Sequence, residues 1–180
     1  MKILVIAAHP QLNASRANKA FLKGLSKYSQ DIHVHDLYQL YPNWIIDVEK
    51  EQQLLLQYDR IVLQFPFYWY SCPPLLKKWL EEVMAHGWAY GPGGDQLIGK
   101  EFLVATTTGG TEKAYRSGGD NQFTISEFLR PLERTITRCN GTYLPAFVSY
   151  AVMTATDETL AEEAIRYAEH IRTPLPVLVH

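Results

Sequence analysis

The sequence has little cysteine, almost no net charge and no long apolar run near its start. Its 180 residues include two cysteines, Cys72 and Cys139, without the paired spacing of a metal site, so unbonded thiols in a reducing compartment are expected. The formal charge of -2 creates no field that would attract nucleic acid. The first apolar run, residues 3–8, ends at His9-Pro10 and is too short for a signal sequence or a membrane span. We therefore expect a cytoplasmic protein that binds no nucleic acid.

Two common phosphate-binding motifs are also missing. The loop after the first apolar run contains neither Gly-x-Gly-x-x-Gly nor Gly-Lys-Ser/Thr, which argues against a dinucleotide fingerprint and a P-loop. What the chain does have is an ordinary globular composition, 47% hydrophobic and 20% charged. Its aromatic residues are unevenly spread, because five of them lie within six positions, namely Phe65, Phe67, Tyr68, Trp69 and Tyr70.

Five segments have the pattern of β-strands. Residues 3–7, 60–65 and 101–106 are mostly apolar, as in the buried central strands of a parallel sheet. Residues 32–35 alternate and suit an edge strand, where we expect exposed histidines rather than a metal site, since no third ligand is apparent. A looser fifth segment covers residues 143–152, with Pro145 near its start.

Segments with helical periodicity separate these strands. We expect one after the N-cap Ser15 to about residue 28, one over about 47–58, one from Pro73-Pro74 to 83, one around 128–136 that Pro131 could interrupt or delay, and one over 160–171. Helices between strands require parallel pairing and right-handed crossovers. The prediction is an α/β fold, a five-stranded parallel sheet in the order 2-1-3-4-5 with helices on both faces. Residues 1–173 form one domain in this interpretation, followed by a loose tail, residues 174–180.

The loop after the first predicted strand, residues 8–18, is a candidate phosphate site. It leads into a helix N-terminus, whose free N–H groups and positive dipole end favour anions. His9, Ser15, Arg16 and Asn18 could add side-chain donors. An ordinary capped helix start explains the same residues, and the two interpretations stay open on this loop alone.

Two further loops leave the same edge of the predicted sheet, where ligands of open parallel sheets bind. Residues 66–74 combine aromatic side chains with prolines, which suits the face and edge of a flat ring, although a core-capping aromatic cluster is the simpler explanation in isolation. Residues 106–111 contain paired glycines, which allow close approach of backbone to a ligand. Together the three loops suit the parts of a flavin mononucleotide.

Several motifs carry a resemblance to a known family. They are His9-Pro10, Ser15-Arg-Ala-Asn18, the run from Pro66 to Lys77, Gly87-Trp-Ala-Tyr-Gly91 and Thr107-Thr-Gly-Gly110. In order and spacing, from residue 1 to about 170, they resemble the flavodoxin-like NAD(P)H:quinone oxidoreductase (diaphorase) family. The stretch from Asp36 to Pro42, with Ile46-Asp47 after it, is similar to the ancillary subunits of glutathione-gated potassium efflux systems.

The resemblance implies a role for each motif. The flavin phosphate would be held by His9, Ser15, Arg16, Ala17 and Asn18. The flavin ring would be framed by Phe67, Tyr68, Trp69 and Tyr70, and its other side would be closed by Thr107, Thr108, Gly109 and Gly110. In a homodimer, the partner's flavin would be approached by Trp88 and Tyr90. Tyr115 would donate a hydrogen bond near the flavin carbonyl. Asp120 stands where the family often has a histidine that assists this step, so a charge relay is in question, and we expect Asp120 to point into solvent.

The sequence thus predicts an FMN enzyme, with FAD possible, that passes hydride from NAD(P)H to a quinone or similar electrophile. The alternative is a regulatory ancillary subunit of a potassium efflux antiporter, held at the inner face of the cell membrane through that protein. A one-electron carrier like flavodoxin is a third reading, less favoured because such carriers are usually strongly acidic and this chain is nearly neutral.

Overall fold

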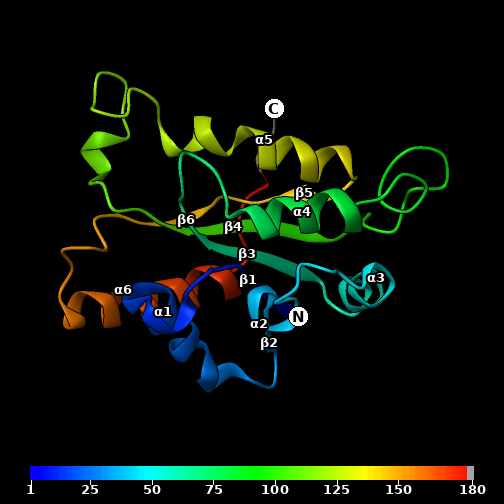
Figure 1. Cartoon of the computed structure of the whole chain (residues 1–180), viewed down its shortest axis with the longest axis horizontal. Coiled ribbons are helices and arrows are strands. Elements are labelled where there is room, and N and C mark those ends of the chain that lie inside the picture. Colours follow the sequence, from blue (N-terminus) through cyan, green and yellow to red (C-terminus); the bar gives the residue numbers. More distant parts are fainter. Residues whose placement is uncertain (178–180) are drawn as a thin grey trace.

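The computed structural model describes residues 1–177 and contains one parallel sheet (Figure 1). Its strands are β1 (Ile3–Ala7), β2 (Ile32–Asp36), β3 (Arg60–Pro66), β4 (Glu101–Thr107), β5 (Thr142–Tyr143) and β6 (Phe147–Ser149). They are ordered β2-β1-β3-β4-β5, and β6 also pairs with β4. All the pairings are parallel, so the predicted α/β fold, strand order and edge position of β2 are confirmed.

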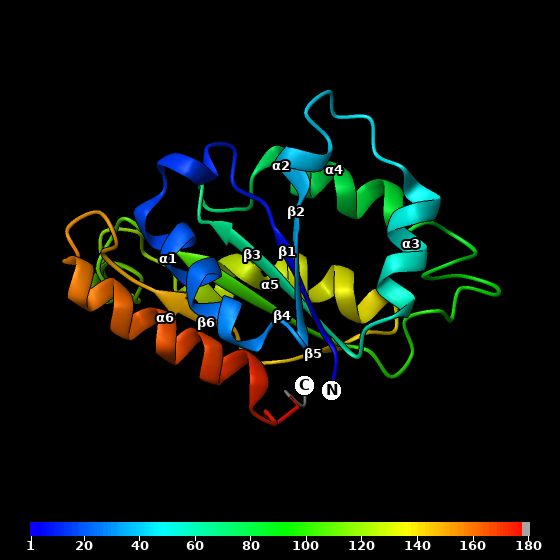
Figure 2. The same cartoon turned by 90° about the horizontal axis from the view of Figure 1, so that it is seen from below.

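Helices cover both faces of the sheet, as expected. On one face lie α1 (Arg16–Leu25) and α6 (Asp157–Arg172), and on the other α2 (Leu37–Leu40), α3 (Val48–Leu56), α4 (Pro74–Val83) and α5 (Ile125–Arg138) (Figures 1 and 2). Short 3-10 turns add Leu12–Ala14, Ser26–Tyr28 and Glu112–Ala114. The one-turn helix α2 was not predicted, because four residues are too few to show a helical period.

The side chains of β3 alternate between two apolar clusters. Ile61 and Leu63 pack with α2 to α5, whereas Val62 packs with α1 and α6. Gln64 follows the same alternation and faces α6, where its side chain meets Tyr167. Gln64 is therefore a buried polar residue on this face, close to the end of the strand, whereas Arg60 at the start of β3 donates to the carbonyl of Ile171 on α6.

Two proline effects differ from the prediction. The fifth strand was expected as one segment, but β5 and β6 are separate short strands with Pro145 between them. A proline has no N–H to give to the ladder with β4, so pairing stops and restarts. Pro131, by contrast, lies inside an unbroken α5. It is exposed, so water can satisfy the carbonyl that lost its partner, while a capping box at Thr124 and Glu127 secures the helix start.

The edge strand also departs from the prediction. His33 is exposed as expected, but His35 is buried, and its Nε2 lies 2.8 Å from a carboxylate oxygen of Glu51 on α3. The same carboxylate, 1% exposed, accepts hydrogen bonds from Tyr41 Oη at 2.5 Å and Trp79 Nε1 at 2.8 Å. The expectation of an exposed His35 was wrong, because a helix 16 residues away supplies its partner.

Near the C-terminus, part of the predicted loose tail is in contact with the core. Leu175 is half-buried against the α1–α6 cluster, and residues 178–180 of the predicted tail lie outside the described residues. Both cysteines are buried and unbonded. In residues 1–177, no helix is long and apolar enough to cross a membrane.

The loops that leave β1, β3 and β4 emerge at one end of the sheet, on the left in Figure 1.

Candidate functional site

A hollow of about 270 Å³ opens beside the N-terminus of α1, where the sequence predicted a phosphate. His9, Ser15, Arg16 and Ala17 line it, together with Tyr68 from the loop after β3. Met153 and Val152 line it from the loop after β6, which was not among the three predicted ligand loops. Four of the five residues assigned to the phosphate therefore share one hollow, which also touches the aromatic loop.

His9 presents a hydrogen-bond donor in this hollow. Its Nδ1 accepts a hydrogen bond from the Gln11 N–H at 3.0 Å, so in the neutral ring the proton resides on Nε2. Burial lowers the pKa of His9, and the charge of Asp36 opposes that shift only in part. The ring also meets Tyr68 edge to face, with centroids 6.0 Å apart. His9 thus offers a neutral N–H whose direction is fixed by Gln11.

The first turn of α1 supplies further donors. Ser15 is its N-cap, and the backbone N–H groups of Arg16 and Ala17 have no hydrogen-bond partner within residues 1–177. The Arg16 guanidinium is half exposed and pairs with Asp157 at 2.6 Å, at the start of α6. An exposed pair of this kind contributes little and exchanges readily for another anion. Backbone, hydroxyl and guanidinium donors thus converge beside His9.

Asn18 has a different place from the other four phosphate residues. It is 2% exposed, and its amide group points inward to Thr107 Oγ1, at 3.1 Å, and to Gln64, at 3.2 Å. The side chain therefore ties the first loop to the ends of β3 and β4. Sequence reasoning missed Gln64, whose only signal was a polar residue within an apolar strand.

The aromatic loop contains a strained tight turn. Tyr68 and Ser71 exchange two backbone hydrogen bonds of 3.0 Å, and the two residues between them, Trp69 and Tyr70, have φ of 46° and 64°. Positive φ at both central positions is the geometry of a type I′ turn, for which Asn-Gly is the usual pair. Such backbone strain costs of order 1–3 kcal/mol per residue and is concentrated at functional sites.

The aromatic rings of this turn differ in how much they pack against the rest of the protein. Trp69 is 92% exposed, which is unusual for a large apolar side chain on a rigid turn. Tyr70 is anchored instead, stacked on Phe128 with centroids 5.0 Å apart and bonded to Asn121 at 3.3 Å. Phe67 packs edge to face on Tyr70. The turn therefore holds aromatic surface outward beside the phosphate hollow.

The loop after β4 completes this edge of the sheet. The hydroxyl of Thr108 donates to the carbonyl of Gly110 at 2.8 Å, which closes a tight bend. A Cβ on Gly110 would lie 3.1 Å from the Tyr115 ring, so that ring would have to shift slightly to admit a side chain there. A Cβ on Gly109 would make an ordinary contact of 3.5 Å with the Met153 side chain. Thr107 faces Asn18, as described above, so this loop is positioned against the first.

The two predicted catalytic residues differ in placement. The Tyr115 ring is half-buried against Phe67, with centroids 5.8 Å apart. Burial and the neighbouring Tyr70 raise the pKa of Tyr115, so it keeps its proton and can donate. Asp120 is exposed, on a loop in which Gly118 has φ of 79°. The tyrosine is thus at the aromatic edge of the site, while the aspartate lies on the outer surface.

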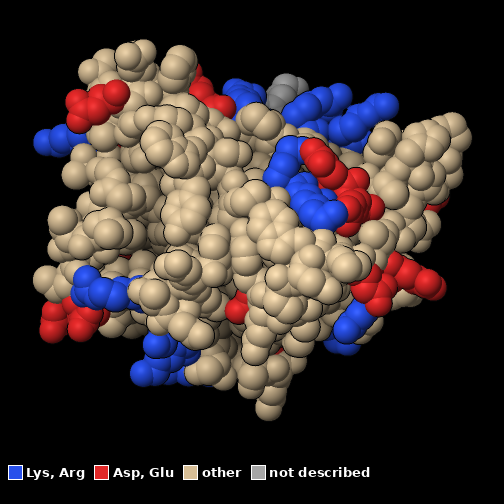
Figure 3. Space-filling view, in the orientation of Figure 1, with Lys and Arg blue, Asp and Glu red and all other residues tan. Residues whose placement is uncertain are grey.

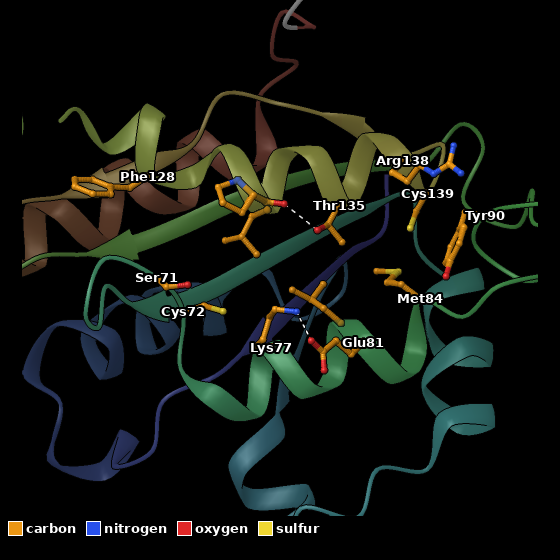
Figure 4. Close-up of a pocket in the computed structure, with 13 residues that line it drawn as sticks. Ser71, Cys72, Lys77, Glu81, Met84, Tyr90, Phe128, Thr135, Arg138 and Cys139 are labelled. Atoms are coloured by element: carbon orange, nitrogen blue, oxygen red, sulfur yellow. Dashed lines mark hydrogen bonds and ion pairs between the residues drawn. The ribbon is translucent and has the colours of Figure 1, made fainter.

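Trp88 and Tyr90 do not join these three loops. A groove of about 350 Å³ runs between α4 and α5, from Ser71 and Phe128 at one end to Tyr90 at the other (Figure 4). Arg138 lies over the Tyr90 ring, 5.8 Å from its centroid. Trp88 is half-buried and packs against the core. Within one copy of the chain these residues are therefore separate from the phosphate hollow.

Comparisons with known proteins show the family to which the chain belongs. A family model described as "Flavodoxin-like fold" matches residues 1–171. Curated relatives include the uncharacterized NAD(P)H oxidoreductase YrkL of Bacillus subtilis, 49% identical over 96% of this chain and 98% of that protein. Another is the glutathione-regulated potassium-efflux system ancillary protein KefG of Enterobacter sp., 41% identical over 99% of this chain and 97% of that protein.

Two solved structures also match over most of the chain. General stress protein 14 from Treponema denticola, in complex with FMN, matches with a TM-score of 0.91 and 37% identity over 95% of this chain and 98% of that one. An NADPH-quinone reductase from P. pentosaceus matches with a TM-score of 0.88 and 34% identity, covering 97% and 99% of the two chains.

Proposed function

Because the chain belongs to the family of proteins with a flavodoxin-like fold, we propose that it is an FMN-dependent oxidoreductase. It transfers hydride from NAD(P)H to a quinone or a similar electrophile. The observation that carries this proposal is a hollow lined by hydrogen-bond donors, placed directly beside a strained turn that holds aromatic rings outward. Relatives named for NAD(P)H oxidation and quinone reduction, and a neighbour in complex with FMN, support the same assignment.

The residues present fit the phosphate of FMN. His9 offers a neutral N–H, Ser15 a hydroxyl, and Arg16 a guanidinium together with a free backbone N–H at the positive end of α1. These groups suit a compact dianion at the end of a ribityl chain. FMN is favoured over FAD because a solved neighbour, 37% identical to this chain, is in complex with FMN.

The flavin, when bound, supplies the redox chemistry by accepting and returning hydride. The protein binds the flavin, orients it and shields it from water. The turn at Trp69 offers a flat apolar surface to a ring, and the bend at Gly110 lets backbone approach the opposite side. With the flavin bound, the Tyr115 hydroxyl would donate a hydrogen bond where negative charge develops, which would favour the transition state more than the ground state. Asp120 takes no part, since its side chain faces solvent.

A homodimer would complete the acceptor site. The face shown in Figure 3 is largely uncharged, apart from its margins and a mixed cluster over α4, where Lys77–Glu81 and Lys78–Glu82 form ion pairs. Such a face suits a second copy. Tyr90, at the far end of the α4–α5 groove, then reaches the flavin of the partner rather than its own. Tyr90→Ala should weaken acceptor binding and leave FMN bound, and a fully active monomer would contradict the dimer.

Steady-state turnover tests the enzymatic assignment. The flavin-free protein should not oxidise NADPH or NADH in the presence of a quinone, and stoichiometric FMN should restore turnover. Riboflavin, which lacks the phosphate, should restore much less at the same concentration. No turnover with either nicotinamide, over a panel of quinones, would contradict the proposal.

A second function is favoured by the KefG relatives. In this reading the same fold binds a potassium efflux antiporter and regulates it, which would place a cytoplasmic protein at the inner face of the membrane through its partner. Co-purification with the antiporter, unchanged in a variant that no longer holds flavin, would favour regulation over catalysis.

A further inference from the structure

We propose that Tyr167 and Gln64 are positioning residues that turn the hydroxyl proton of Ser15 into the phosphate hollow. Their effect is to select a phosphorylated flavin over an unphosphorylated one. The proposal rests on the FMN assignment above. A chain of buried hydrogen bonds carries it, running from Tyr167 on α6, through Gln64 on β3 and Asn18 on α1, to Ser15 at the helix start.

The direction of this chain is set by a group that can only accept. Gln64 Nε2 lies 3.3 Å from the backbone carbonyl oxygen of Asn18 and 3.2 Å from its side-chain Oδ1. A carbonyl oxygen cannot donate, so the amide nitrogen of Gln64 must face Asn18 and its Oε1 must face away. Tyr167 Oη lies 2.9 Å from that Oε1 and is therefore the donor. Burial raises the pKa of Tyr167, which keeps the donated proton in place.

The polarity continues to Ser15. With its Oδ1 accepting from Gln64, Asn18 turns its amide nitrogen toward Ser15 Oγ, at 3.4 Å, and Thr107 Oγ1, at 3.1 Å. Ser15 Oγ also accepts from the Asn18 backbone N–H at 3.2 Å. A hydroxyl oxygen has two lone pairs, and both are now used. The hydrogen of Ser15 has no acceptor within residues 1–177, and Ser15 lines the hollow, so this hydrogen is available to a ligand there.

Packing alone does not require polar groups at these positions. Gln64 and Tyr167 are 2% and 0% exposed, in the apolar layer that contains Val62 and Leu103. Burying an amide and a phenol is costly unless every polar atom is paired, and an apolar pair would fill the same space. What the polar pair adds is orientation, because a fully satisfied network fixes each proton in one direction.

Binding of FMN and riboflavin to the flavin-free protein tests this inference. The two ligands share the ring and ribityl chain and differ in the phosphate. Tyr167→Phe removes one hydroxyl and keeps the ring. Without this hydroxyl, Gln64 Oε1 has no donor to hold it, and the proton of Ser15 is no longer fixed. We expect the dissociation constant for FMN to rise about tenfold, the effect of losing the Ser15 hydrogen bond to the charged phosphate, while that for riboflavin stays within about twofold.

A matched control and a double-mutant cycle complete the test. Tyr143→Phe is the control, because that hydroxyl is buried on the other face of the sheet and has no partner within the described part of the chain. It should change neither constant. Ser15→Ala should weaken FMN binding as Tyr167→Phe does, and the double variant should bind no more weakly than Ser15→Ala alone, since the relay acts through Ser15.

The outcomes separate the possible failures. Equal weakening of FMN and riboflavin by Tyr167→Phe, or independent effects in the double variant, would overturn the relay and indicate general loosening. If Tyr167→Phe does not fold, Gln64→Met takes its place and the same criteria apply. A parent protein that binds neither flavin would overturn the proposed function itself, whereas one that binds FMN with no effect of Tyr167→Phe would overturn only the relay.

Discussion

Replacing Trp69 by asparagine should make the flavin-free protein more stable and its flavin site weaker. Trp69 has φ of 46° and is 92% exposed, so it stores backbone strain without contributing much packing. The left-handed region costs an ordinary residue about 1–2 kcal/mol, and asparagine tolerates it better. We therefore expect a gain of about 1 kcal/mol in the free energy of unfolding.

Urea unfolding measures this gain. With an m-value of about 2 kcal/mol per molar urea, a gain of about 1 kcal/mol raises the midpoint by about 0.5 M. Flavin binding should change in the opposite direction, because one aromatic wall is lost. A loss of about 1 kcal/mol corresponds to a dissociation constant about fivefold higher.

A matched variant separates strain from function. Gln122 is also exposed and has φ of 63°, but it lies outside the aromatic turn. Gln122→Asn should raise the midpoint similarly and leave flavin binding unchanged. If Trp69→Asn leaves the midpoint unchanged or lowers it while Gln122→Asn raises it, the strain at Trp69 is not what the backbone geometry implies.

Three further predictions follow from the site and the core. Combined Ser15→Glu and Arg16→Glu should abolish FMN retention without unfolding the chain, because like charges then face the phosphate; a variant as yellow as the parent would place the phosphate elsewhere. Tyr115→Phe should slow flavin reduction by NAD(P)H about tenfold, and Asp120→Ala should not; rapid mixing distinguishes these, and the reverse result would exchange their roles. Burial raises the pKa of Glu51, but hydrogen bonds from its three partners outweigh burial and lower it overall, so its contribution to stability is present at neutral pH and lost as pH falls through the folded-state pKa. Urea unfolding over a pH series should therefore show a smaller acid-induced loss in the less stable variant Glu51→Gln, and parallel curves would contradict this.

The strands and most helices could be predicted from the sequence because their signals are local. The apolar run of β1 and the capping of α1 by Ser15 are visible within ten residues of chain. The prediction of one continuous fifth strand was wrong at Pro145, since a single missing N–H divides that strand into two. At Pro131 the opposite error occurred, because an interruption was expected and α5 is continuous. That this proline lies on an exposed face of the helix could not be predicted from the neighbouring sequence.

The sequence predicted which loops lie together at one end of the sheet, but not the hydrogen bonds that connect them. Asn18 was expected at the phosphate, yet its side chain points inward and accepts a hydrogen bond from Gln64, which is 46 residues away in the sequence. His35 was expected in solvent and is instead paired with Glu51. Positive φ at Trp69 has no sequence signal, because aromatic residues are not the usual occupants of such a turn. Long-range partners and strain are properties of the folded chain, not of any window within it.

The central claim is that the three loops hold FMN and that NAD(P)H reduces it there. Anaerobic addition of NADPH or NADH to the FMN-loaded protein, followed by a quinone, tests this most directly. We predict that the visible absorbance of the bound flavin bleaches with one equivalent of the nicotinamide and returns with one equivalent of the quinone. Flavin that does not bind, or that binds and stays oxidised with both nicotinamides, would contradict the account.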